Sequence, residues 1–171
     1  SMKMMSYKNI FFKNIICEYL LNRWLRDQLG LSYLKSAATG GAALGPDTFK
    51  FFVDIGIPLR QLYGQTEQIG AYTIHNKDDV DYDSVGYPFE GIKIKIDKAD
   101  KEGIGEIIVK NPNSMNGYLN VTEPFLNKGW FHTGDAGYIN KKNHLVVIDR
   151  MSDMSYTSDK LRYSPQYIEN K

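Results

Sequence analysis

The chain has 171 residues, of which 42% are hydrophobic and 24% charged, a composition typical of a globular protein with a core. Its formal net charge of +1 gives no long-range attraction for nucleic acid, so that class of partner is not supported. The single cysteine, Cys17, cannot form an internal disulfide and fits a reducing, cytoplasmic compartment. No run of about eighteen apolar residues occurs, so a membrane-spanning helix is not expected.

The first predicted element is a helix over residues 8–29, which Gly30 ends. Its apolar side chains recur at helical spacing and are expected to face the core. They are Phe12, Ile16, Tyr19, Leu20, Trp24 and Leu25. Basic residues outnumber acidic ones in this segment, so contact with a membrane surface is the alternative function of the same face.

A strand–helix–strand unit follows. The pattern predicts a short buried strand over residues 33–38, a helix from Pro46 to about Ile55, and a second strand from Pro58 to Tyr63. This order is typical of a piece of parallel sheet, in which ligands collect at the carboxyl ends of the strands.

After Gly70 the sequence becomes rich in short β segments separated by Gly, Asn, Asp or Lys. Strands are predicted over residues 71–74, 91–97, 105–110, 135–139 and 144–148. Residues 140–143 read as a hairpin turn. The predicted fold class is therefore mixed α and β, with a short parallel βαβ piece followed by a mostly antiparallel sheet or distorted β-barrel.

The most informative segment is Tyr63-Gly64-Gln65-Thr66-Glu67. It offers an aromatic face for a base, a glycine expected to break the strand, a hydroxyl donor for phosphate and an acid for a metal ion. Three further motifs accompany it in a fixed order along the chain. They are Thr39-Gly40-Gly41-Ala42-Ala43-Leu44, Gly129-Trp130-Phe131-His132-Thr133-Gly134-Asp135 and Asp149-Arg150.

Together these motifs resemble the adenylate-forming superfamily of acyl-CoA synthetases, luciferases and peptide-synthetase adenylation domains. The greatest likeness is to long-chain fatty acyl-CoA synthetases, over roughly residues 20–171. The resemblance implies the fold of the second half of an acyl-CoA synthetase N-terminal domain. It further implies that residues 1–70 belong to a nucleotide-binding subdomain, 71–150 to a β-rich subdomain, and 151–171 to a hinge and the start of a small C-terminal domain.

The resemblance also implies a set of nucleotide-binding residues. These are Gly40, Gly41, Ala42, Gln61, Leu62, Tyr63, Gly64, Gln65, Thr66, Asp135 and Arg150. Within this set Tyr63 is expected against adenine, while Asp135 and Arg150 are expected to reach the ribose. Thr66 and Glu67 are the implied catalytic residues, with Thr66 on the α-phosphate and Glu67 as the metal ligand for Mg²⁺.

The implied reaction joins a fatty acid to CoA at the expense of ATP, through an acyl-adenylate, with ATP/AMP, Mg²⁺ and CoA as cofactors. The phosphate-binding loop and the late catalytic lysine of this superfamily are not found in the sequence, so the chain is expected to be a fragment without turnover of its own. A non-catalytic nucleotide-binding or scaffold module of the same fold is the alternative. The residues give no indication of oligomeric state.

Two other metal sites are weaker hypotheses. Asp79, Asp81, Asp83 and Glu90 fall at calcium-loop positions, but Ser84 stands where that loop requires glycine, so a solvated acidic loop is expected. The histidines His75, His132 and His144 lie on separate predicted elements and predict no zinc site.

Overall fold

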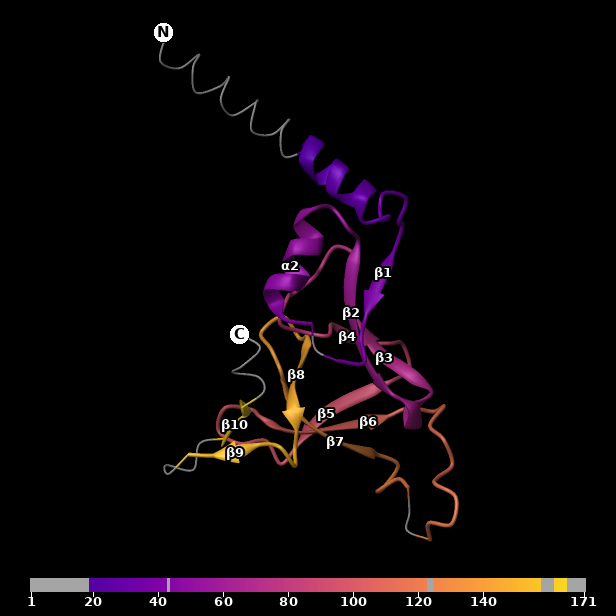
Figure 1. Cartoon of the computed structure of the whole chain (residues 1–171). Helices are drawn as coiled ribbons and strands as arrows, with labels where there is room; N and C mark the ends of the chain where they lie inside the picture. The colour runs from indigo at the N-terminus through magenta and orange to yellow at the C-terminus, as the bar shows by residue number, and fades with distance from the viewer. Residues whose placement is uncertain (1–18, 43, 123–124, 158–161, 166–171) are drawn as a thin grey trace, which may run out of the picture.

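Two four-stranded sheets form the body of the protein in a computed structural model that describes residues 19–42, 44–122, 125–157 and 162–165 (Figure 1). The first sheet has the order β1-β2-β3-β4 and the second the order β5-β6-β7-β8. The first sheet contains β1 (Ala37–Thr39), β2 (Leu59–Gln65), β3 (Gly70–Ile74) and β4 (Tyr87–Pro88). The second contains β5 (Lys93–Asp97), β6 (Gly105–Lys110), β7 (Phe131–Ile139) and β8 (Leu145–Arg150).

The strand–helix–strand unit is confirmed. β1 pairs in parallel with β2, and helix α2 (Pro46–Asp54) connects them, with Pro46 at its first turn. The prediction of a buried strand over residues 33–38 is wrong in extent and in burial. Tyr33 is 97% exposed, and β1 is a three-residue edge strand that pairs with β2 alone among the described strands.

Residues 19–28 are helical, as expected, and the rest of the predicted helix lies outside the described residues. The expected packing of its apolar face is wrong for Tyr19, Leu20 and Trp24, each of which is more than half exposed. The helix instead meets the end of α2 through polar contacts. Arg26 donates to the carbonyl oxygen of Ile55, a carbonyl group left free at the helix terminus. Within the described residues, no helix is both long and apolar enough to span a membrane.

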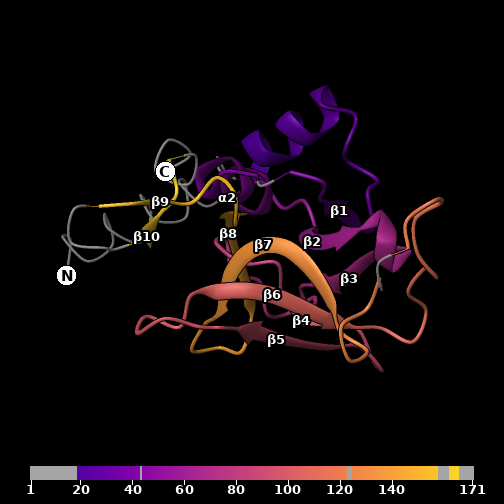
Figure 2. The same ribbon diagram turned by 90° about the horizontal axis from the view of Figure 1, so that it is seen from below.

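The second sheet is wholly antiparallel and does not close into a barrel. Of the two predicted forms, the structure therefore has the antiparallel sheet and not the distorted barrel. Viewed from below, β7 arches across β6 and β5 (Figure 2). The hairpin turn predicted over residues 140–143 joins β7 to β8. Asn143 adopts a positive φ of 63° there, and its N–H donates to the carbonyl of Asn140 at 2.9 Å.

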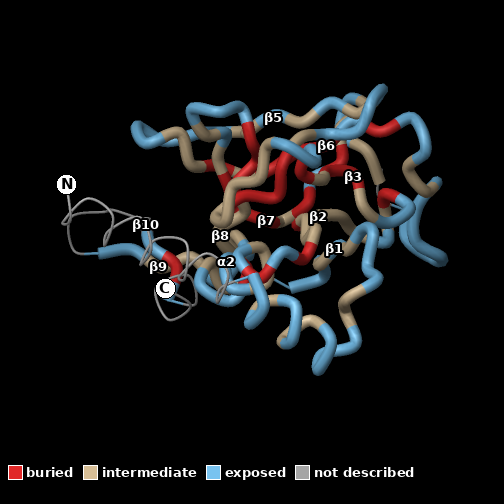
Figure 3. The backbone as a smooth tube through the Cα atoms, turned by 90° about the horizontal axis from the view of Figure 1, so that it is seen from above, coloured by how far each residue is buried: buried red, intermediate tan, exposed pale blue. Residues whose placement is uncertain are grey.

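The core lies between the two sheets, where the buried stretches of the chain converge (Figure 3). Tyr72 from β3 contributes from the first sheet, and Ile107, Val109 and Leu145 contribute from the second. Alternation along β6 accounts for this, because every second side chain of a strand points to the same face.

Gly64 does not break its strand, contrary to the sequence-based expectation. It lies within β2, where the register against β3 shifts. A Cβ atom at Gly64 would come 2.1 Å from the carbonyl oxygen of Gly70, so only glycine permits this close approach of two backbones. The strand then turns directly into the short 3₁₀ helix η1 (Thr66–Gln68).

A buried chain of polar side chains connects the two sheets, and it brings together two histidines that were expected to be separate. The hydroxyl of Ser84 lies 2.9 Å from His75 Nε2 and 2.9 Å from His144 Nδ1. His144 Nε2 lies 3.2 Å from the Asp79 carboxylate, and the backbone N–H of Gln61 donates to His75 Nδ1 at 3.1 Å. Because His75 Nδ1 accepts a hydrogen bond, the neutral ring carries its proton on Nε2.

Burial is the largest cause that lowers the pKa of His75, to about 4, with the adjacent His144 as the next. The unfolded chain takes up this proton below its ordinary pKa of 6.5, whereas the folded protein takes it up only near pH 4. The free energy of unfolding is therefore expected to fall as the pH is lowered through this window. Urea unfolding at pH 7, 6 and 5 measures the fall.

His75→Gln is the matched variant, since glutamine retains polar atoms without titrating. We expect its free energy of unfolding to change less between pH 7 and pH 5 than that of the unsubstituted chain. Equal pH dependence in the two proteins would show that His75 does not contribute.

Candidate functional site

Asp135 lies at a bulge in β7. Between the pairs Glu106–Ala136 and Ile108–His132, three residues of β7 face the single residue Ile107 of β6. Gly134 takes the positive φ of 71° that this bulge requires. The Thr133 hydroxyl donates to the Ile107 carbonyl at 2.7 Å and accepts from the Asp135 N–H at 3.0 Å. The Thr-Gly-Asp run is therefore part of a strand that begins at Phe131, four residues before the predicted start at Asp135.

The bulge directs the Asp135 carboxylate into contact with β2 and β8. The Tyr63 hydroxyl donates to Oδ2, the Gln65 amide donates to the same oxygen at 2.9 Å, and Arg150 Nη1 lies 2.9 Å from Oδ1. The Asp135 side chain is 8% exposed, while that of Arg150 is 57% exposed. Three segments far apart in the sequence thus meet at one carboxylate.

The pKa of Asp135 reflects two opposing effects. Burial raises it above its ordinary value, and the hydrogen bond from Tyr63 and the charge of Arg150 act in the opposite direction. Burial also raises the pKa of the Tyr63 hydroxyl, so Tyr63 stays protonated and remains a donor. The cluster is therefore built around a desolvated acceptor whose donors come from two strands.

A cavity of about 470 Å³ opens beside this cluster. Its lining combines apolar walls with a few polar groups, as ligand sites commonly do. Of the predicted nucleotide-binding residues, the following line it: Gly41, Ala42, Gln61, Leu62, Tyr63, Gly64, Gln65, Asp135 and Arg150. Gly40 is not among the lining residues, and a Cβ there would meet the Leu62 side chain at 2.2 Å, so its role is close packing against β2.

Two buried acceptors in this cavity are left without a partner. Within the described residues, Gln61 Oε1 and Gln65 Oε1 make no hydrogen bond. Buried acceptors of this kind are costly unless a donor reaches them. Gln61 and Gln65 therefore carry, at the wall of the cavity, acceptor capacity that the described residues do not use.

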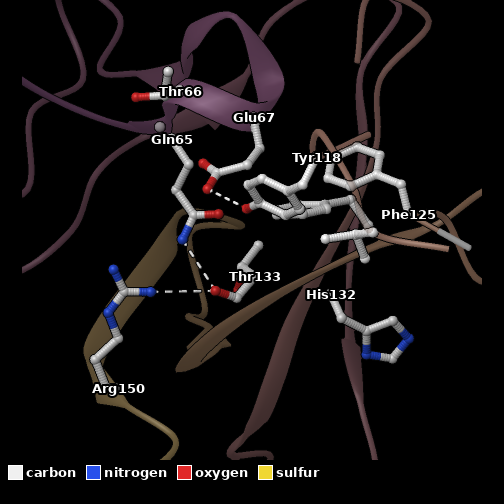
Figure 4. Close-up of a pocket in the computed structure, with 11 residues that line it drawn as sticks. Gln65, Thr66, Glu67, Tyr118, Phe125, His132, Thr133 and Arg150 are labelled. Atoms are coloured by element: carbon white, nitrogen blue, oxygen red, sulfur yellow. Dashed lines mark hydrogen bonds between the residues drawn. The ribbon is translucent and has the colours of Figure 1, made fainter. Parts of the chain in front are cut away.

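A second cavity, of about 710 Å³, contains the predicted catalytic residues (Figure 4). Thr66 and Glu67 line it from η1, and Gly64, Gln65 and Arg150 line both cavities. The predicted base-and-ribose residues and the predicted phosphate-and-metal residues therefore occupy adjoining spaces that meet at Arg150. Thr66 and Glu67 line only the larger cavity, whereas Gln61 and Leu62 line only the smaller one.

Glu67 has a partner that sequence reasoning missed. The Tyr118 hydroxyl donates to Glu67 Oε1 at 2.6 Å (Figure 4). This bond is the largest cause that lowers the pKa of Glu67, so the carboxylate is ionised at neutral pH. An ionised carboxylate with a second oxygen available is a suitable ligand for Mg²⁺.

The segment that carries Tyr118 is attached to η1 by backbone and side-chain contacts. The Met115 N–H donates to the Glu67 carbonyl at 3.0 Å, and the Ser114 hydroxyl donates to Gln68 Oε1 at 2.7 Å. The Tyr118 ring packs edge-on against Phe125 with centroids 5.8 Å apart. These contacts hold the phenol where it can orient the Glu67 carboxylate.

Replacement of Tyr118 by phenylalanine tests this orientation. Tyr118→Phe removes the donor and keeps the ring packing, so the pKa of Glu67 is expected to rise toward its ordinary value. The carboxyl ¹³C shift of Glu67, followed by NMR from pH 3 to pH 7, measures the change.

The control is Tyr156→Phe, which removes a phenol from an exposed position on β9 (Ser155–Tyr156). That substitution is expected to leave the titration of Glu67 in place. If Tyr118→Phe and Tyr156→Phe give the same Glu67 titration curve, the contact does not act on Glu67.

The chain matches one family model and many known proteins. The model described as "AMP-binding enzyme" matches residues 11–119. The long-chain-fatty-acid–CoA ligase heimdall of Drosophila melanogaster is 32% identical over 149 residues, which cover 85% of this chain and 22% of that protein. The long-chain-fatty-acid–CoA ligase ACSBG2 of Homo sapiens is 30% identical over 173 residues, with 99% of this chain and 26% of that protein covered.

Solved structures agree with the fold. The o-succinylbenzoate CoA synthetase MenE of Bacillus subtilis, in complex with the acyl-adenylate intermediate, superposes with a TM-score of 0.73 and 28% identity. The match covers 80% of this chain and 30% of MenE. The fold is thus that of an adenylate-forming enzyme N-terminal domain. The chain spans about a quarter of the length of the relatives named above. On the extent of the family match and the identity to these relatives, the chain belongs to the AMP-binding enzyme family, whose matched members include CoA ligases.

Proposed function

We propose that this chain is part of an ATP-dependent ligase that activates a long-chain fatty acid as its adenylate and then transfers the acyl group to CoA. The observation that carries the proposal is the meeting of Tyr63, Asp135 and Arg150 at the smaller cavity, which adjoins the larger one at Arg150. The names of the relatives from Drosophila and human support the fatty acid. A bacterial relative named 2-succinylbenzoate–CoA ligase, 33% identical over 129 residues, shows that the shared fold also serves other acids.

The smaller cavity is assigned to the nucleoside. Its unpartnered Gln61 and Gln65 oxygens would accept from the adenine amino group, and Gly41 and Ala42 would allow a flat ring to approach the backbone. Asp135 would accept hydrogen bonds from the ribose hydroxyls, because an ionised carboxylate accepts and cannot donate. Arg150 would contact the same ribose from β8.

The larger cavity is assigned to the phosphates and the reacting carboxylate. Thr66 would donate its hydroxyl to the α-phosphate, and Glu67 would hold Mg²⁺. Bound Mg²⁺ would neutralise phosphate charge as two anions approach. Arg150 would add a guanidinium at the boundary between the cavities.

Residues 151–171 are proposed to form a hinge and the start of a small C-terminal domain. The described part of this segment is attached to β8, since the Ser164 hydroxyl donates to the Asp149 carboxylate next to Arg150. Between Arg150 and Ser164 in the sequence, β9 pairs antiparallel with β10 (Arg162–Tyr163). A cytoplasmic location is proposed on the basis of the single cysteine in this chain.

The second candidate function is a nucleotide-binding or scaffold module without catalysis. The Tyr118–Glu67 contact favours the ligase, because a scaffold that binds only nucleoside has no use for an ionised, oriented carboxylate in the larger cavity.

Binding of AMP to the chain tests the ribose assignment. Asp135→Asn keeps the size of the side chain but removes its charge and one acceptor. Loss of a charged hydrogen bond costs about 1.5–3 kcal/mol, so we expect AMP to bind at least about tenfold more weakly. Isothermal titration calorimetry on both proteins measures the ratio of the two Kd values.

Asp153→Asn is the matched control, since Asp153 is an exposed aspartate that lines neither cavity. Its Kd for AMP is expected to equal that of the unsubstituted chain. Equal affinity in the chain and in Asp135→Asn would remove Asp135 from the ribose site and, with it, the nucleotide-binding proposal.

A further inference from the structure

Asp97, Glu106 and His132 form a compact group on three adjacent strands. His132 also lines the larger cavity, although no nucleotide contact is assigned to it. Asp97 on β5 pairs directly with Glu106 on β6, and His132 on β7 lies next to them. Each offers one donor atom, and the three atoms lie within 4.8 Å of one another. The His132 ring points away from Gln65 and Arg150 (Figure 4).

We propose that this group binds one Zn²⁺ ion, distinct from the Mg²⁺ assigned to Glu67. The donor set is one imidazole nitrogen and two carboxylate oxygens, which zinc accepts in sites that complete their shell with water. The imidazole disfavours Mg²⁺ and Ca²⁺, which prefer oxygen ligands. The partial exposure of His132 leaves access for the ion and its water.

Geometry supports the assignment. Glu106 Oε2 and His132 Nδ1 are 2.8 Å apart, so this hydrogen bond would open by a fraction of an ångström to reach the roughly 3.4 Å that separates tetrahedral ligands at zinc bond lengths of about 2.0–2.2 Å. The other oxygen of Glu106 accepts from the Gly134 N–H at 3.1 Å, which fixes the direction of the carboxylate. The Asp97 oxygen lies within 4.8 Å of the other two donor atoms, so a rotation of its side chain would be needed to complete the site. Zinc takes the place of the proton between Glu106 and His132, and the neutral imidazole then carries its proton on Nε2.

The charge around these residues supplies an independent argument. Two like charges directly opposite each other on paired strands destabilise a sheet unless a cation compensates them. In the described part of the chain, no lysine or arginine forms an ion pair with Asp97 or Glu106. Lys95, two residues from Asp97 on the same strand, is directed onto the Trp130 ring at 4.4 Å from its centroid. Bound zinc would supply the missing positive charge.

The ion would also connect the site to the β7 bulge. Glu106 contacts both His132 and the Gly134 N–H, and Gly134 directly precedes Asp135. Zinc would hold β5, β6 and β7 together next to the bulge. We therefore expect zinc to raise the melting temperature and to shift the amide NMR signal of Gly134.

Zinc titration of the metal-free, untagged chain tests the proposal. The background is Cys17→Ser, because a thiol is a strong zinc ligand and Cys17 lies outside the described residues. We expect one zinc ion per chain by calorimetry and a higher melting temperature with zinc. His132→Gln and Asp97→Asn are each expected to weaken zinc binding at least about tenfold.

Glu90→Gln is the control, since it removes an exposed acid from the turn that precedes β5. It is expected to leave the zinc Kd unchanged. Circular dichroism without zinc establishes that each variant is folded. The proposal is overturned if 100 µM zinc gives no saturable binding, or if His132→Gln and Asp97→Asn bind zinc as tightly as the Glu90→Gln control. Neither result affects the ribose assignment, which rests on AMP binding.

Discussion

The Asp135 carboxylate is the point on which the arrangement of the site depends. It accepts from Tyr63 and Gln65 on β2 and pairs with Arg150 on β8, so it joins the first sheet to the second. Burying a carboxylate is costly unless donors replace the lost water, and here side chains from two strands supply them. The two cavities adjoin at this contact because Gln65 and Arg150 line both of them.

The β7 bulge is the local device that makes this contact available. Thr133 replaces strand hydrogen bonds with its hydroxyl, Gly134 accepts the left-handed backbone, and Asp135 is displaced toward β2. Glu106 stabilises the bulge from the neighbouring strand through the Gly134 N–H. The same Glu106 carboxylate belongs to the proposed zinc site, so the bulge and that site share this side chain.

Most strands, helix α2 and the grouping of the candidate site residues could be predicted from the sequence. Short β-rich segments between turn residues located β5, β6 and β8, and proline and glycine located α2, because these signals are local. Grouping of Tyr63, Asp135 and Arg150 came from resemblance, and their contacts bear out the grouping. Burial of residues 33–38 was mispredicted, since Tyr33 lies before an edge strand and its exposure depends on which strands pair with β1.

The remaining errors share a physical cause. Gly64 was interpreted as a strand break, and the strand after Gly134 was predicted to begin only at Asp135, because glycine is common in turns. Both glycines lie within strands at places of irregular register. Tyr118 lies 51 positions from Glu67, and His144 lies 60 positions from Ser84, so no periodicity reveals these contacts. Long-range polar contacts of this kind depend on the complete packing of the chain.

The most direct test of the central claim compares the binding of AMP and 2′,3′-dideoxy-AMP to the unsubstituted chain by calorimetry. Asp135 at the junction of the cavities is proposed to hold the ribose diol, so removal of both hydroxyls leaves a desolvated acceptor without its ligand donors. The account predicts that AMP binds at least about tenfold more tightly than the dideoxy nucleotide. Equal Kd values for the two nucleotides would contradict it.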